Sequence, residues 1–273
     1  MRLGVAGNPI AHSLSPDIHY AFAKSLGIEI TYERYLFAHE GFEHEAQALF
    51  EEGVQGLNVT VPFKQDAYKF ADELDPLARA AGAVNTLVKR ANGVCGYNTD
   101  GVGMVRDLQV RHNVELQGAA ALILGAGGAC RGIIQPLLNA GVKRIWVGNR
   151  TLERAHEVVA EFSLDHGGAL AAVALDSLGS NPPEAGLVFN STALGLDNSD
   201  IQLPTAIVAG RVCYDLSYGA QARFAQWAEV NGASRSLDGL GMLVEQAAES
   251  FDLWLGSRPD TNPIYGALKQ KLT

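Results

Sequence analysis

Short apolar runs alternate with amphipathic stretches over the first hundred residues. The runs have the short length and the β-branched and aromatic content of buried strands, and they cover residues 3–6, 30–37, 56–60 and 86–88. Two stretches between them, residues 17–26 and 42–50, have apolar residues at helical spacing. Strands and helices in this alternation predict a mostly parallel sheet with helices on its faces.

The same alternation returns in the second half of the chain. Its apolar runs predict further strands over residues 120–124, 144–147, 187–189 and 212–214. A helix is predicted over residues 130–139, because Ala140-Gly141 then supplies a glycine that can take the left-handed conformation at the helix end. Thr151 is a candidate N-cap for the helix that follows. This half has the pattern of a doubly wound Rossmann-type sheet.

The length of 273 residues favours two domains over one. Two helical segments, residues 100–111 and 240–255, are placed to carry the chain from the first half to the second and back. The sequence therefore predicts a two-domain α/β protein with a cleft between the domains. Residues 1–100, completed by residues 240–273, form an α/β substrate-binding and catalytic domain, and residues 101–239 form the nucleotide-binding domain.

Charge narrows the choice of partner. The net charge is −9 and the pI is near 5.2, whereas nucleic acid or a membrane surface would favour a basic face. A small-molecule ligand fits better, and any anion must be held by local donors. Whether the protein is a monomer or a homodimer is left open by the sequence.

Cysteine usage and hydropathy bear on location. Cys95, Cys130 and Cys213 are widely spaced and lie mostly among apolar neighbours, which predicts buried reduced thiols and no disulfide framework or metal site. No export signal and no membrane-spanning segment are expected, so the protein is predicted to be cytoplasmic.

The turn after residue 124 has the composition of a dinucleotide site. It reads Gly125-Ala126-Gly127-Gly128-Ala129 and joins an apolar strand to a helix. In such a site the backbone N–H groups and the positive helix end meet the pyrophosphate, and side chains would block the approach. Cys130 stands where a third glycine is usual, and it is small enough for close packing of helix and strand. The alternative is a plain strand-to-helix turn.

The end of the next strand indicates which dinucleotide is bound. NAD sites carry an acidic residue there, but this chain has Asn149, Arg150 and Thr151, followed by Arg154. The two arginines can clamp a 2′-phosphate, with Asn149 and Thr151 as neutral donors. Charge-assisted hydrogen bonds contribute about 1.5–3 kcal/mol each, so this set predicts NADP. The alternative, two solvated arginines, is electrostatically poor at a helix N-terminus without an anion.

Two serines in the first domain are candidates for binding a carboxylate. Ser13 and Ser15 come just before a helix predicted to begin at Pro16. Their hydroxyls can hold an anionic group, or they can simply cap the helix.

Taken together, the motifs resemble those of the shikimate dehydrogenase family, in the family's order and over nearly the full length. Besides the glycine turn, the serine segment and Asn149-Arg-Thr151, the resemblance is carried by Asn58-Val-Thr-Val-Pro-Phe-Lys64, Gly82-Ala-Val-Asn-Thr86, Tyr97-Asn-Thr-Asp-Gly101 and Asp238-Gly-Leu-Gly-Met-Leu-Val-Glu-Gln246. One departure follows Tyr218, where Gly219-Ala-Gln-Ala-Arg-Phe224 replaces a segment in which the family usually has a Pro and a Thr-Pro pair.

The resemblance implies NADP-dependent, reversible interconversion of shikimate and 3-dehydroshikimate, and it assigns roles to residues of this chain. The implied catalytic pair is Lys64 and Asp100. Contacts to the substrate carboxylate are implied for Ser13, Ser15 and Tyr218, and contacts to the ring hydroxyls for Asn58, Thr60, Asn85 and Gln246. The nicotinamide side is implied to be lined by Leu216, Gly239 and Met242.

This chemistry needs a proton carrier, because loss of hydride from C3 makes the substrate hydroxyl strongly acidic. An ammonium group stabilises the developing alkoxide, and a carboxylate beside it fixes its position, so no metal is required. The sequence leaves open whether Lys64 or Asp100 moves the proton, and Lys64 is the first candidate. Alternative functions are a quinate/shikimate dehydrogenase with relaxed cofactor use and a non-catalytic ligand sensor, although a sensor would be expected to have lost Lys64 or Asp100.

Overall fold

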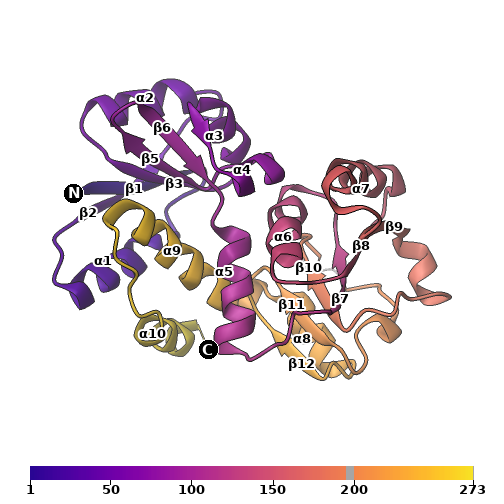
Figure 1. Cartoon of the computed structure of the whole chain (residues 1–273). Coiled ribbons are helices and arrows are strands. Elements are labelled where there is room, and N and C mark those ends of the chain that lie inside the picture. Colours follow the sequence, from indigo (N-terminus) through magenta and orange to yellow (C-terminus); the bar gives the residue numbers. More distant parts are fainter. Residues whose placement is uncertain (195–199, 273) are drawn as a thin grey trace. The chain divides into compact units, whose positions relative to one another are not determined.

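The computed structural model describes residues 1–194 and 200–272, and the chain divides into two compact units (Figure 1). The first unit comprises Met1–Met104 and Leu243–Lys271, and the second is built on Val105–Met242. The first unit is therefore discontinuous in sequence, and its second segment is the C-terminal part of the chain. No helix among the described residues is long and apolar enough to cross a bilayer.

The first unit contains a six-stranded sheet in the order β2-β1-β3-β5-β6-β4. Its strands are β1 (Arg2–Gly7), β2 (Thr31–Leu36), β3 (Gly56–Val59), β4 (Glu73–Leu74), β5 (Thr86–Arg90) and β6 (Gly93–Tyr97). Only β5 runs against its neighbours, β3 and β6, and the remaining pairs are parallel. The predicted mostly parallel sheet is confirmed.

Two strands of this sheet were not predicted, for reasons visible in their sequences. β4 is only two residues long, and β6 contains two glycines, which weaken a strand signal. Packing explains Gly96: a Cβ there would lie 2.8 Å from Val84 Cγ2 and 2.9 Å from Ala71 Cβ. Gly96 has a low β propensity, but a residue with a side chain would not fit at this position.

Helices of the first unit flank this sheet. They are α1 (Ser15–Leu26), α2 (Phe42–Glu51), α3 (Lys64–Phe70), α4 (Pro76–Ala81), most of α9 (Leu240–Leu255) and α10 (Asn262–Leu272). Trp254 at the end of α9 packs with Leu3, Val5 and Tyr32, and its indole nitrogen donates a hydrogen bond of 3.0 Å to the Leu87 carbonyl. The C-terminal part of α9 is therefore anchored on the sheet of this unit.

The second unit contains a fully parallel sheet in the order β12-β11-β10-β7-β8-β9. Its strands are β7 (Ala120–Leu124), β8 (Arg144–Asn149), β9 (Leu170–Ala174), β10 (Leu187–Asn190), β11 (Val212–Asp215) and β12 (Arg235–Leu237). Its helices are α6 (Gly128–Asn139), α7 (Leu152–His166) and α8 (Arg223–Val230), with short 3₁₀ turns at Leu175–Gly179, Thr205–Ile207 and Gly219–Gln221. The predicted doubly wound sheet is confirmed, and β9 and β12 are additions to it.

Helix ends match the predictions in part. α6 begins at Gly128, two residues earlier than predicted, and ends as expected before Gly141, which has a φ of 91°. Thr151 occupies the N-cap position of α7 but makes no capping hydrogen bond through its side chain. The prediction of its position was right and that of the bond was wrong, because a helix start can be satisfied in other ways.

The predicted helix over residues 100–111 is α5 (Asp100–Arg106), continued by a π-helical turn, Asp107–Arg111. In this turn the buried Asp107 accepts hydrogen bonds from Arg111 Nε at 3.0 Å and from the Tyr214 hydroxyl at 2.9 Å. Gly241 leaves room for the carboxylate, since a Cβ there would overlap Asp107.

The three cysteines are unpaired, as predicted. Cys130 and Cys213 are buried, and burial raises the pKa of each thiol to about 12. Cys95 is half-buried, so the prediction of full burial is wrong for this residue.

Candidate active site

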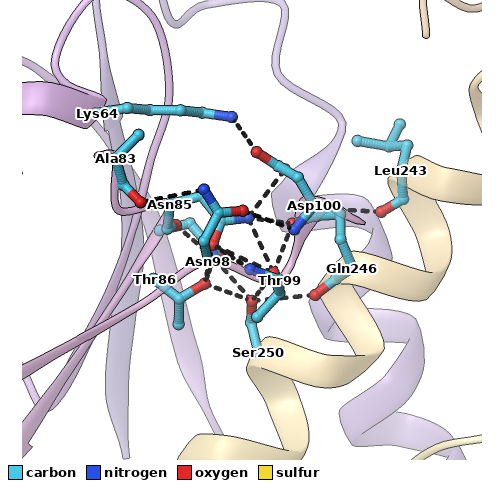
Figure 2. Close-up of polar contacts among 11 residues, drawn as sticks. Lys64, Ala83, Asn85, Thr86, Asn98, Thr99, Asp100, Leu243, Gln246 and Ser250 are labelled. Atoms are coloured by element: carbon cyan, nitrogen blue, oxygen red, sulfur yellow. Dashed lines mark hydrogen bonds and ion pairs between the residues drawn. The ribbon is translucent and has the colours of Figure 1, made fainter. Parts of the chain in front are cut away.

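An ion pair lies at the start of two helices of the first unit. Lys64 begins α3, Asp100 begins α5, and Lys64 Nζ lies 2.5 Å from Asp100 Oδ2 (Figure 2). The side chains are 31% and 19% exposed, so the pair is accessible to a ligand while fixed by its surroundings. A carboxylate in the first turn of α5 also interacts favourably with the helix dipole. The two residues predicted to form the catalytic pair are therefore in contact.

Asn85 holds the other oxygen of Asp100. Its Nδ2 donates a hydrogen bond of 2.9 Å to Asp100 Oδ1, and its Oδ1 accepts one of 2.9 Å from the backbone N–H of Thr99. A backbone N–H can only donate, so the amide oxygen must face Thr99 and the amide nitrogen must face Asp100. Both carboxylate oxygens of Asp100 thus accept hydrogen bonds, one from Asn85 and one from Lys64.

Gln246 on α9 closes the group. Its Oε1 lies 3.3 Å from Asn85 Nδ2, and its own Nε2 donates to the Leu243 carbonyl at 2.8 Å. Gly103 on α5 makes this approach possible, because a Cβ at that position would lie 2.5 Å from the backbone nitrogen of Gln246. Lys64, Asn85, Asp100 and Gln246 come from four separate segments and converge in Figure 2.

The turn before α5 is held by Asn98. Its Oδ1 accepts from the backbone N–H of Asp100 at 3.2 Å, and its Nδ2 donates to the Ala83 carbonyl at 3.0 Å. Asn98 is buried, so these bonds are shielded from water. Asn98 therefore links the Tyr97–Gly101 motif by hydrogen bonds to the loop that carries Asn85.

In the predicted carboxylate site, Ser13 is half-buried and Ser15 is buried. Helix α1 was predicted to begin at Pro16. It begins one residue earlier, at Ser15. Neither serine caps the helix through its side chain; Ser13 Oγ instead accepts from the backbone N–H of Ser15 at 3.3 Å. The Arg34 guanidinium donates to the Ser13 carbonyl at 2.6 Å and 3.1 Å. Arg34 was not predicted, because this contact links distant segments.

Thr60 follows β3, where its backbone N–H donates to the Ala6 carbonyl at 3.0 Å. Thr60 is half-buried. A Cβ on Gly7 would lie only 2.5 Å from the Thr60 methyl carbon. Thr60 and Gly7 thus meet at the ends of neighbouring strands, β3 and β1.

Asn58 on β3 lies deep in the first unit. It is only 6% exposed. Its Oδ1 accepts from the Tyr32 hydroxyl at 2.7 Å and faces His19 Nε2 at 3.2 Å, while its Nδ2 faces acceptors on β5 and α9. Its polar atoms are thus engaged inside the protein, as are those of Asn85, which is 3% exposed.

His19 is part of this buried network through its contact with Asn58. Its ring is fully buried and stacks on Tyr32 with ring centroids 4.4 Å apart. Burial lowers the pKa of His19 to about 3, and the hydrogen bond to Asn58 offsets this only in part. The ring is therefore neutral at physiological pH.

In the second unit, the glycine turn is shaped to approach a ligand with its backbone. Gly127 and Gly128 face open space, since a Cβ on either would meet no atom within 4 Å. Gly125 has a φ of 105°, and a Cβ there would lie 2.7 Å from Thr192 Cγ2. Arg131 braces the turn by donating to the Ala126 carbonyl at 3.1 Å. This cradle at the start of α6 fits the diphosphate of a dinucleotide.

The predicted 2′-phosphate clamp lies between β8 and α7. Arg150, Thr151 and Arg154 are exposed, and Asn149 Nδ2 donates to the Thr151 carbonyl at 2.8 Å. Among residues 1–194 and 200–272, neither arginine forms an ion pair. Two exposed guanidinium groups beside the positive end of a helix fit a phosphate group better than they fit water alone.

Two of the residues predicted to line the nicotinamide side, Leu216 and Gly239, approach each other closely. A Cβ on Gly239 would overlap the Leu216 carbonyl, so only glycine permits this approach, and the Gly239 N–H donates to the Ser217 carbonyl at 2.8 Å. Met242 follows at the start of α9. Tyr218 lies in the adjoining loop, where burial raises the pKa of its hydroxyl.

Asp215, at the end of β11, supports that loop and was not predicted. It is 1% exposed and accepts hydrogen bonds from the backbone N–H groups of Ser217 at 3.1 Å, Phe224 at 3.0 Å and Ala225 at 3.3 Å. Burial raises its pKa to about 6. The available signal was an acid at the end of an apolar strand.

One unit with a parallel sheet and an open glycine turn, and a second unit with a lysine–aspartate pair, together define the class of two-unit α/β dehydrogenases. Three family models match the chain. They are the shikimate dehydrogenase substrate binding domain over residues 5–87, shikimate / quinate 5-dehydrogenase over residues 108–196, and the shikimate 5'-dehydrogenase C-terminal domain over residues 239–269.

Whole-chain comparisons agree with the family models. A shikimate dehydrogenase (NADP(+)) from Alkalilimnicola ehrlichii is 47% identical over 270 residues, which cover 98% of each chain. The crystal structure of a shikimate 5-dehydrogenase from Thermus thermophilus, in complex with NADP(H) and shikimate, has a TM-score of 0.83 at 34% identity and covers 99% of each chain. An Ael1 enzyme from Pseudomonas putida has a TM-score of 0.91 at 34% identity over 100% of this chain and 98% of that one. The chain belongs to the shikimate dehydrogenase family, as its motifs predicted.

Proposed function

We propose that this protein catalyses the NADP-dependent, reversible reduction of 3-dehydroshikimate to shikimate. The observation that carries the proposal is the contact between Lys64 and Asp100, with Asn85 and Gln246 around it. The names of the curated relatives and the ligands in the solved structures support the same reaction. A ligand sensor without turnover would not need this pair, and it is retained here.

Reduction at C3 builds negative charge on the carbonyl oxygen of the substrate. NADPH, when bound, supplies the hydride. The Lys64 ammonium stabilises the developing alkoxide and delivers a proton to it, and Asp100 holds the ammonium in place through its 2.5 Å contact. In the reverse direction Lys64 takes the proton back. Asp100 is the second candidate for carrying the proton, because it too is partly exposed.

Substrate contacts are proposed for the residues that the motifs single out. Ser13, Ser15 and Tyr218 hold the carboxylate, and Thr60, Asn85 and Gln246 hold the ring hydroxyls. Asn58 is proposed for the second group as well, since, like Asn85, it is a nearly buried amide that hydrogen-bonds to its protein neighbours.

NADP is proposed to bind in the second unit. The turn of Gly125, Ala126, Gly127, Gly128 and Ala129 holds the diphosphate, and Arg150 and Arg154, with Asn149 and Thr151, hold the 2′-phosphate. Leu216, Gly239 and Met242 line the nicotinamide ring.

The roles of the two domains and the location of the protein are part of this proposal. We assign substrate binding to residues 1–100 with 240–273 and cofactor binding to residues 101–239. The unpaired cysteines support a cytoplasmic location. The enzyme acts as a monomer or a homodimer, and sedimentation of the purified protein distinguishes the two.

The test is a matrix of two substrates and two cofactors. Purified protein is mixed with shikimate or quinate and with NADP or NAD, and the reduced nicotinamide is followed by absorbance. Efficient turnover is expected only for shikimate with NADP. Equal efficiency with quinate would favour the broader quinate/shikimate activity, and no turnover with any pair would overturn the proposal.

A further inference from the structure

A chain of buried hydroxyl and amide groups lies directly behind Asn85. Thr86 on β5, Asn58 on β3 and Ser250 on α9 are its nearest members, and Asn85, Thr86 and Ser250 are labelled in Figure 2. Neither Thr86 nor Ser250 has an assigned role in the reaction. Their hydrogen bonds nevertheless determine where the Asn85 amide points.

The Thr86 hydroxyl is fully used. Its Oγ1 lies 2.9 Å from Asn85 Oδ1, which can only accept, so the hydroxyl hydrogen must point to Asn85. Its two lone pairs then face Asn58 Nδ2 at 3.1 Å and Ser250 Oγ at 2.7 Å. Ser250 therefore gives its hydrogen to Thr86, which is nearer than the Gln246 carbonyl at 3.1 Å.

The orientation of the Asn58 amide is fixed from the other side. The Asn85 carbonyl, 3.2 Å from Asn58 Nδ2, can only accept. At the opposite end, burial raises the pKa of the Tyr32 hydroxyl well above 10, so this hydroxyl stays protonated and donates to Asn58 Oδ1 at 2.7 Å; His19 Nε2 lies 3.2 Å from the same oxygen. The amide nitrogen must therefore face Thr86.

We propose that Thr86 is a positioning residue, which acts through Asn85 to present the Asn85 amide nitrogen to Asp100 and to the substrate. Asn58 and Ser250 fix the direction of its hydroxyl. This inference rests on the proposed function, because Asn85 is a substrate contact only in that reaction. The backbone N–H of Thr99 shares the task, so the loss of Thr86 weakens the orientation without abolishing it.

Thr86→Val removes the hydroxyl at nearly constant volume, and Thr86→Ser restores it. For Thr86→Val we expect kcat/KM for shikimate to fall roughly three- to tenfold, the net value of one neutral hydrogen bond. KM for NADP should stay within twofold, and Thr86→Ser should stay within twofold of wild type. Thermal unfolding of each variant is recorded so that assays run well below the transition.

A double-mutant cycle with Asn85→Ala separates positioning from a general structural role. If Thr86 acts through Asn85, then Thr86→Val changes kcat/KM by less than twofold in the Asn85→Ala background. The same loss in both backgrounds, unchanged kinetics for Thr86→Val, or a Thr86→Ser variant as impaired as Thr86→Val would overturn the inference. If Thr86→Val does not fold, Ser250→Ala, which removes the donor to Thr86, carries the same cycle.

The two proposals fail separately in this experiment. A wild-type enzyme that turns over shikimate with NADP while Thr86→Val matches it overturns only the role of Thr86. A wild-type enzyme without that activity overturns the proposed function and this inference with it.

Discussion

Asn190 Nδ2 donates a hydrogen bond of 3.1 Å to Asp215 Oδ1, and both side chains are buried at the ends of neighbouring strands. Asn190 Oδ1 accepts in turn from the backbone N–H of Thr192 at 3.1 Å. Thr192 is the residue that a Cβ on Gly125 would meet. One buried carboxylate is thus linked to both the loop that follows β11 and the glycine turn.

This carboxylate predicts a pH dependence of stability. The pKa of Asp215 rises from 3.8 to about 6 on folding, so between these values the folded protein binds a proton that the unfolded chain has released. The contribution of Asp215 to the free energy of unfolding is therefore largest below pH 3.8 and falls as the pH rises through about 6. A shift of this size corresponds to roughly 3 kcal/mol.

Asp215→Asn removes this titration. The unfolding free energy of each protein is measured by urea titration. The value for wild type minus the value for the variant should fall from pH 4 to pH 7, because only the wild type loses stability through Asp215. A difference that is constant over this range would show that Asp215 does not titrate there.

Lys64→Ala should lower kcat by about 100- to 10,000-fold, the usual contribution of a positioned acid or base. Shikimate affinity, measured by calorimetry, should change little, because the ammonium acts mainly on the charge of the transition state. Asp100→Asn is the matched comparison. If Asp100→Asn lowers kcat more than Lys64→Ala does, Asp100 carries the proton. If Lys64→Ala instead loses shikimate binding and retains kcat, Lys64 is a binding residue.

Arg150→Ala and Arg154→Ala should each raise KM for NADP by roughly 10- to 100-fold, since each removes a charge-assisted contact to the 2′-phosphate. Turnover with NAD, which lacks that phosphate, should not become worse. Lys143→Ala is the control, because Lys143 is an exposed cation just before the opposite end of β8. Equal effects on NADP and NAD would contradict the clamp.

Gly103→Ala should destabilise the first unit by about 1–3 kcal/mol, because its Cβ would press on the backbone of Gln246 and separate α5 from α9. Gly266→Ala on α10 is a control in which the new Cβ meets nothing within 4 Å and improves helix propensity, so it should be neutral or stabilising by up to about 1 kcal/mol. Thermal unfolding of both variants tests this, and a neutral Gly103→Ala would show that the two helices can separate freely.

Much of the architecture could be read from local pattern. The strands 3–6, 120–124 and 187–189 are apolar runs bounded by turn residues, and each lies within an observed strand. Strands β4, β6 and β12 escaped because short or glycine-containing strands owe their pairing to neighbours that are distant in sequence. The Asp100–Arg106 helix was predictable, but its π-helical continuation depends on a carboxylate that Tyr214 and Gly241 accommodate.

The sequence by itself determined the reactive groups of this protein: a lysine, an aspartate, paired serines, a glycine turn and two arginines in place of an acid, each legible because its chemistry is local. Only the tertiary structure decided how those groups are held. Asn58 and Asn85 look alike in sequence and both are buried, yet Asn58 hydrogen-bonds to Thr86 and Ser250 whereas Asn85 hydrogen-bonds to Asp100. Hydrogen bonds between residues as far apart as Asn58 and Ser250 create that difference, and no local pattern records them.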